Sequence, residues 1–227
     1  MTVEWGQKRG VAKGSRRKFS RFAGQLQLLS RVSVQWFEKE NRDLVRIETA
    51  ELIEPLGRRF EDLEGILHAS YMAEHMVKFT QENEKSELFS RLLGSTIDAV
   101  REGVPRDLAL RYFEVWVLRI AGIFPVPREC PECGRGLLGA GAALPRNGDS
   151  IVCGECAGGF PALLVGEGAL DFIQRSGSHS LLDLSGARPG PAVLARVEEI
   201  CRQVRCGFLD HDLRSYDVMK ATLGEAL

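Results

Sequence analysis

The stretch GVAKGSRRKFSRFAGQ, residues 10–25, combines positive charge with aromatic side chains and contains no acidic residue. Two phenylalanines, Phe19 and Phe22, interleave with its cations, and at least one of them is expected in the core. Cationic side chains neutralise phosphates and aromatic faces accept stacked bases, so this composition favours a nucleic-acid-binding segment. A solvated loop without a partner is the alternative. The five cations are Lys13, Arg16, Arg17, Lys18 and Arg21.

The charge of the 227-residue chain is unevenly distributed, although the net charge is only −1. Residues 1–31 hold eight Lys and Arg against one acid, which gives +7. Residues 61–125 hold seven against eleven, which gives −4, and residues 126–227 hold ten against thirteen, which gives −3. We therefore expect phosphate to be bound by the first segment and protein partners by the acidic remainder.

Hydrophobic periodicity predicts an α+β fold with a boundary near residue 57. Alternation over residues 32–37 is typical of a half-buried strand, and residues 44–48 and 51–54 are expected as two further strands. Residues 1–57 should then form a β domain and residues 58–227 a mainly α-helical domain. Helices are expected to begin near residue 63 and to cover 88–100, 108–120 (with Asp107 as a possible cap), 167–175 and 190–209.

Four cysteines form two C-x-x-C pairs, Cys130/Cys133 and Cys153/Cys156, separated by nineteen residues. This spacing is typical of a zinc site, and four thiolates close the tetrahedron so that the metal is structural. A redox dithiol, or a site without metal, is the alternative. We assign the module to residues 126–160, with a flexible insert, GAGAALPRNGDS (139–150). Cys201 and Cys206 are expected to be buried free thiols.

Motifs of common enzyme classes do not occur in the sequence: there is no Walker A, G-x-G-x-x-G, G-x-S-x-G or H-E-x-x-H pattern. His68 and His75 are interpreted as helix-surface or partly buried residues, and the pair Glu198/Glu199 as helix-surface charge. No enzymatic activity is therefore expected. No stretch is long and apolar enough for a membrane span, and no secretory signal begins the chain, so a cytoplasmic protein is expected.

The sequence also resembles the RecO family of bacterial recombination mediators. Three segments carry the resemblance: VAKGSRRKFSRFAGQLQ (11–27), TAELIEPL (49–56) after a hairpin, and RYFEVWVLRIAGIFPVPRECPECG (111–134). The order of basic β domain, helical domain, four-cysteine insert and C-terminal helices matches throughout. Members usually have additional residues in front of the basic stretch, so the resemblance implies an OB-fold barrel that lacks its first strand and exposes a strand edge.

The resemblance implies a function in recombinational DNA repair. RecO-like proteins bind single- and double-stranded DNA, anneal complementary strands, act with RecR, recognise the C-terminal tail of single-stranded DNA-binding protein and help to load RecA. By carry-over, the five cations of residues 10–25 face DNA, the four paired cysteines bind structural Zn²⁺, and the protein is associated with the nucleoid. Two other hypotheses remain open: a zinc-containing interaction scaffold that does not bind DNA, and a zinc-dependent hydrolase or redox enzyme.

Overall fold

The computed structural model describes residues 1–227 except 3, 41, 125–127, 147–149, 159–160 and 225–227. The fold is mixed α+β and divides into two compact units, Met1–Arg91 with Val218–Leu227, and Leu92–Asp217. Helices α2 (Glu87–Arg101) and α7 (Arg214–Gly224) contribute residues to both units. Within the described ranges, no helix has the length and apolar character that crossing a membrane requires.

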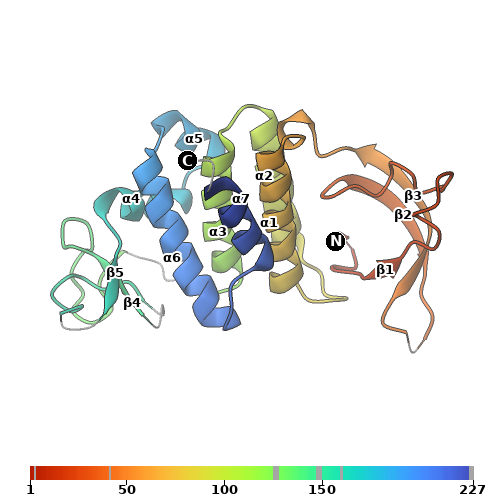
Figure 1. Ribbon diagram of the computed structural model, residues 1–227. Coiled ribbons are helices and arrows are strands. Elements are labelled where there is room, and N and C mark those ends of the chain that lie inside the picture. The colour runs from red at the N-terminus through yellow and green to blue at the C-terminus, as the bar shows by residue number, and fades with distance from the viewer. Residues whose placement is uncertain (3, 41, 125–127, 147–149, 159–160, 225–227) are drawn as a thin grey trace. The chain divides into compact units, whose positions relative to one another are not determined.

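The first unit contains a three-stranded sheet in the order β1-β3-β2, formed by β1 (Gly10–Val11), β2 (Arg31–Phe37) and β3 (Val45–Glu54). Strands β2 and β3 pair antiparallel, and β1 pairs parallel with the start of β3 (Figure 1). Side chains of β2 alternate between exposed and half-buried, as the sequence predicts. The sheet thus has one face turned to solvent.

The two strands predicted at residues 44–48 and 51–54 are in fact the single strand β3, which begins one residue later, at Val45. The linking residues Thr49 and Ala50 include neither glycine nor proline, and both pair with β2, so nothing interrupts the strand there. The register shifts at two places, between Arg31 and Val32 and between Gln35 and Trp36 of β2, and each shift leaves one residue of β3, Ile53 and Glu48, without a directly opposite partner. The result is a long β2–β3 hairpin in which β3 is the central strand of the sheet.

Helix α1 (Leu63–Phe79) follows the short 3₁₀ helix η1 (Arg58–Phe60). The carboxylate of Asp62 accepts a 2.7 Å hydrogen bond from the Gly65 backbone N–H, which caps the helix start. The helix was expected to begin here, but its two histidines, His68 and His75, are buried rather than on the surface.

The second unit is built around helix α3 (Arg106–Ile120), which is buried on most of its circumference. Helices α4 (Glu167–Ser176), α5 (Leu181–Ala187) and α6 (Pro191–Leu209) pack against it (Figure 1). The sequence predicts α2, α3, α4 and α6, whereas α5 and α7 are additional. Asp107 is not the cap of α3, because Pro105 occupies that position and Asp107 lies in the first turn.

Strand β4 (Ala143–Pro145) of the four-cysteine module pairs antiparallel with β5 (Ala162–Leu164), which follows the module. The predicted flexible insert is therefore wrong for residues 142–145, since Ala142, Ala143 and Leu144 are buried. Residues 147–149 of that insert lie outside the described residues. The buried side chains of Ala143 and Leu144 on β4 thus contribute to a core within the module.

Candidate nucleic-acid interface and metal centre

Residues 12–25 form a series of hydrogen-bonded turns between β1 and β2. The N–H groups of Ser15, Arg17, Ser20 and Ala23 each donate to the carbonyl three residues earlier, at 3.0–3.1 Å. We call residues 12–25 the basic loop. Each of these turns carries a cation at a central position: Lys13, Arg16, Lys18 and Arg21 in chain order. The winding of the backbone thus presents the charges one after another on exposed corners.

The ion pairs of the N-terminal segment distinguish two groups of cations. Lys8 pairs with Glu38 at 2.9 Å, Arg9 with Glu82, Arg21 with Glu48 at 3.8 Å and Arg31 with Glu54 at 3.5 Å. In the part of the chain that the structure describes, no acidic group pairs with the other four cations. These four, which are all exposed, are Lys13, Arg16, Arg17 and Lys18.

The two phenylalanines of the basic loop lie in opposite environments. Phe22 is 3% exposed and belongs to the core, which confirms that at least one of the two is core. Phe19 is 91% exposed. The side-chain oxygen of Gln25 accepts a hydrogen bond from the Leu52 backbone N–H at 2.6 Å. Phe22 and Gln25 therefore hold the loop against the sheet while the cations and Phe19 project from it.

The four paired cysteines come together as the spacing predicts. Their sulfur atoms all lie within 4.8 Å of one another, and the Sγ atoms of Cys133 and Cys153 are 3.7 Å apart. Tetrahedral coordination with Zn–S bonds of about 2.3 Å separates sulfurs by about 3.8 Å, so the donor set fits zinc. A disulfide needs about 2.05 Å, so all four cysteines are free thiols.

Backbone geometry explains the shape of the two knuckles. The Gly134 N–H donates to the Cys130 carbonyl at 2.8 Å, and Gly134 has a φ of 71°, which favours glycine. Gly154 has a different role. A Cβ atom there would lie 3.0 Å from the Gly141 carbonyl oxygen, so glycine is needed for close packing between chain segments.

The thiols of the cluster influence one another's protonation. The Cys153 backbone N–H is the main cause that lowers the pKa of Cys130 to about 6. Hydrogen bonds with the sulfurs of Cys153 and Cys133 raise the pKa of Cys156 to about 12. Four sulfurs this close cannot all ionise without a neighbouring cation, and a divalent metal ion would supply that charge.

Sequence reasoning missed a buried charge cluster in the second unit, formed by Arg111, Glu114, Glu198, Arg205 and Asp212. Arg111 lies 3.1 Å from both Glu114 and Glu198, and Arg205 lies 2.6 Å from Asp212. The Tyr216 hydroxyl donates to Glu198 at 2.9 Å. Glu198 is therefore not surface charge, whereas the carboxylate of its neighbour Glu199 is 55% exposed and pairs with Arg196.

The remaining cysteines lie apart from the metal cluster. Cys201 is fully buried on α6, and burial raises its pKa far above the ordinary value. Cys206 is only half-buried, so the prediction of a buried thiol holds for Cys201 alone. The basic loop and the four-cysteine cluster belong to different compact units, and each forms a site by itself.

Comparison with known proteins identifies the family. A family model described as the N-terminal part of recombination protein O matches residues 1–56, and one for its C-terminal part matches residues 60–213. The DNA repair protein RecO of Roseiflexus sp. (strain RS-1) is 31% identical over 216 residues, which cover 92% of this chain and 74% of that protein.

Two further relatives, both with the same name, match over similar lengths. The protein of Anaeromyxobacter sp. (strain K) is 28% identical over 94% of this chain and 83% of its own length. That of Pelotomaculum thermopropionicum is 29% identical over 94% of this chain and 82% of its own length. Since two family models and full-length relatives agree, the chain belongs to the RecO family of DNA repair proteins, with a role in recombinational repair.

Proposed function

We propose that this protein is a DNA-binding recombination mediator without catalytic activity of its own. It binds single- and double-stranded DNA through Lys13, Arg16, Arg17, Lys18 and Arg21, anneals complementary strands, and acts with RecR to load RecA onto strands coated with single-stranded DNA-binding protein. The C-terminal tail of that protein is a further partner. Residues 1–57 act as an OB-fold-like DNA-binding domain, and residues 58–227 as a helical domain for protein partners.

The observation that carries DNA binding is the set of four exposed cations, Lys13 to Lys18, that pair with no acid among the described residues. Cations that bind phosphate release condensed counterions, so affinity depends on charge and not on sequence. Two strands held by such a loop repel each other less, which favours their pairing. A protein that binds DNA in this way is expected to be associated with the nucleoid.

The metal site has a structural role in this proposal. Cys130, Cys133, Cys153 and Cys156 would hold Zn²⁺, which supplies folding free energy to the module of residues 126–160. Four thiolates complete the coordination sphere and leave no position for an activated water. The cysteine geometry therefore favours a mediator over the alternative of a zinc-dependent hydrolase.

Anisotropy of a fluorescent single-stranded oligonucleotide across a salt series tests DNA binding. The test variant replaces Arg16, Arg17, Lys18 and Arg21 by alanine. Each phosphate contact contributes about 0.7 to the slope of log affinity against log salt, so the slope should fall by up to about 3. A control variant removes four exposed cations elsewhere, Lys78, Lys85, Arg91 and Arg188.

Three outcomes of this experiment are distinct. Affinity that falls with salt in the wild type and the control, and is lost in the test variant, supports the proposal. Equal affinity at low and high salt contradicts the electrostatic mechanism. Absence of binding by the wild type favours the alternative function, a zinc-containing interaction scaffold that does not bind DNA.

A further inference from the structure

Phe19 occupies an exposed corner of the basic loop. It lies at a central position of the turn Arg17–Ser20, in which the Ser20 N–H donates to the Arg17 carbonyl at 3.0 Å. Its side chain is 91% exposed, and the Lys18 ammonium lies 5.8 Å from its ring centre. The ring is therefore largely accessible to a ligand, with the Lys18 ammonium over one face and cations on the turns before and after it.

The loop that carries Phe19 is anchored, so the ring has a defined position. Phe22, three residues later, is buried beneath the Arg21 guanidinium, 5.0 Å from the ring centre. A single exposed apolar residue is common on protein surfaces and by itself indicates nothing. What distinguishes Phe19 is its place on an anchored turn between side chains that attract phosphate.

A second exposed ring stands on the sheet that supports this loop. Phe37 ends strand β2 with 61% of its side chain exposed, and pairs in register with Arg46 of β3. Glu48 lies 2.9 Å from Arg46 and 3.8 Å from Arg21, so a chain of charges connects the sheet face to the basic loop. Phe37 thus has a cation as its cross-strand neighbour, as Phe19 has on its turn.

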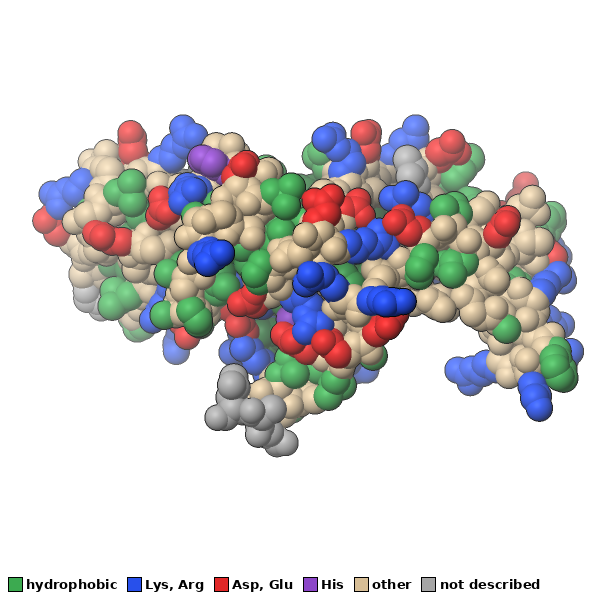
Figure 2. Space-filling model, turned by 90° about the horizontal axis from the view of Figure 1, so that it is seen from above, with side chains coloured by type: hydrophobic (Ala, Val, Ile, Leu, Met, Phe, Trp, Pro, Cys, Tyr) green, Lys and Arg blue, Asp and Glu red, His purple; other side chains and the backbone are tan. Residues whose placement is uncertain are grey.

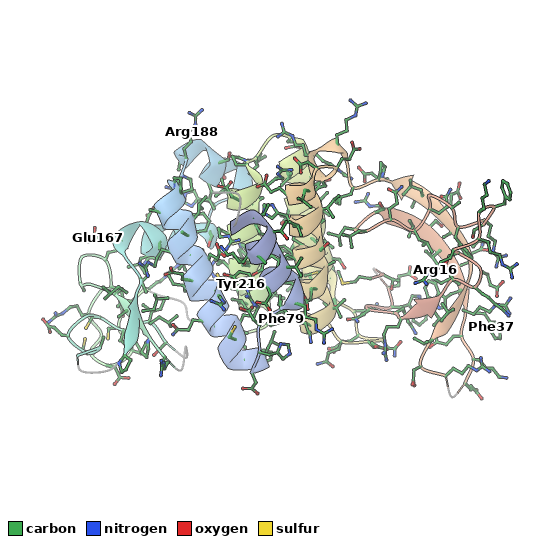
Figure 3. All side chains as sticks on the ribbon, viewed as in Figure 1. Arg16, Phe37, Phe79, Glu167, Arg188 and Tyr216 are labelled. Carbon is green, nitrogen blue, oxygen red and sulfur yellow. The ribbon has the colours of Figure 1, made fainter. Side chains whose placement is uncertain are left out.

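The figures show where these groups lie. Arg16 and Phe37 are both in the sheet region, well away from helix α1 (Figure 3). In the space-filling view, Lys and Arg side chains and hydrophobic side chains gather at the end of the sheet region (Figure 2). Acidic side chains are sparse on that end in the same view. Cations and apolar groups thus occupy one exposed region of the first unit.

We propose that Phe19 and Phe37 are stacking platforms for unpaired bases, which give the DNA site a preference for single strands over duplex. This inference rests on the proposed DNA binding and names its specificity residues. The cations bind the phosphates of either form. In a duplex the bases already stack on one another, so only an unpaired strand offers a free base face to the rings.

Anisotropy with one labelled oligonucleotide, single-stranded or annealed to its complement, tests the inference at fixed salt. Stacking on an aromatic ring corresponds to about 5- to 150-fold in affinity per base. Phe19→Ala and Phe37→Ala should each weaken single-strand binding within this range and leave duplex binding and the salt slope unchanged. Phe19→Leu should weaken single-strand binding as much as Phe19→Ala does, and Phe19→Trp should retain the single-strand affinity of the wild type.

The matched control is Ile53→Ala, since Ile53 is 60% exposed on the same sheet and has no ring. Its affinity for both forms should equal that of the wild type, and circular dichroism should show all variants folded. Single-strand affinity that is unchanged in both alanine variants, or lowered equally for single strand and duplex, overturns the stacking role while leaving phosphate binding intact. Absence of DNA binding by the wild type overturns the proposed function and this inference together.

Discussion

Glu198 and Glu199 are adjacent acids on helix α6, and the structure predicts a much larger loss of stability when the charge of Glu198 is removed than when that of Glu199 is. Glu198 is 13% exposed, pairs with Arg111 at 3.1 Å and accepts a hydrogen bond from Tyr216 at 2.9 Å. Glu199 is 55% exposed and pairs only with Arg196, at 2.7 Å, among the described residues. Glu198→Gln and Glu199→Gln thus make the same chemical change, a carboxylate to an amide, at a buried and at an exposed position.

The magnitude follows from the charge balance of the buried cluster. Arg111, Arg205 and the partly exposed Arg202 face three carboxylates, Glu114, Glu198 and Asp212, so the set is neutral. Removing one partner of a buried pair costs about 3–5 kcal/mol. In Glu198→Gln the new amide oxygen would still accept the Tyr216 hydrogen bond, and the position is slightly exposed, so we expect about 2–3 kcal/mol. An exposed pair contributes about 0–1 kcal/mol, which sets the expectation for Glu199→Gln.

Urea denaturation monitored by the fluorescence of Trp116 measures this difference. The indole N–H of Trp116 donates to the Ser176 carbonyl at 2.9 Å, so its emission reports the packing of α3 on α4. Trp5 and Trp36 belong to the other unit and are replaced by phenylalanine in every variant. If the free energies of unfolding of Glu198→Gln and Glu199→Gln differ by less than about 0.5 kcal/mol, at equal m-values, the reasoning is refuted.

Two further predictions concern the charges and thiols of the second unit. Burial alone would raise the pKa of Asp212, but hydrogen bonds from Arg202 and Arg205 outweigh it and hold that pKa below the ordinary value. The stabilisation by ionised Asp212 is therefore complete above about pH 4 and is lost as the pH falls through the lowered pKa. The difference in free energy of unfolding between the wild type and Asp212→Asn should therefore shrink on acidification. A difference that stays constant from pH 7 to pH 3 contradicts this prediction. Titration of the thiols with a mercurial, followed by a zinc-sensitive dye, should release one Zn²⁺ per chain from the wild type and from the control Cys206→Ser, but none from Cys133→Ser. Release of equal amounts of zinc from all three proteins would exclude the four-cysteine site.

Local patterns predicted those elements whose signal is contained within one segment. Alternation over residues 32–37 predicted β2, and apolar recurrence over residues 88–100 predicted α2. The C-x-x-C spacing predicted the cluster of four sulfurs, because a two-residue gap brings two thiols of one knuckle together whatever surrounds them.

Burial on a helix could not be predicted in the same way, because it depends on which helices surround it. Arg111 and Glu114 of α3 read as polar positions, yet they are buried because other helices cover that face too. A signal was present: apolar residues occupy every position of LALRYFEVWVL (108–118) except Arg111 and Glu114, which is typical of a central helix. The i,i+3 pair of opposite charge within it indicates an internal ion pair. Conversely, Leu88 and Phe208 fit their apolar stripes but are exposed, since they lie in terminal turns.

The division of the arginines makes the proposed phosphate binding compatible with a net charge of −1. Arg111 and Arg205 are buried and neutralised within the second unit, so they hold helices together and attract nothing outside it. Arg16 and Arg17 contribute no ion pair to the fold among the described residues, so their positive potential is available to a ligand. It follows that alanine at the loop positions should alter DNA affinity at constant stability, while Glu198→Gln should alter stability at constant DNA affinity. The two effects are separable because different charges carry them.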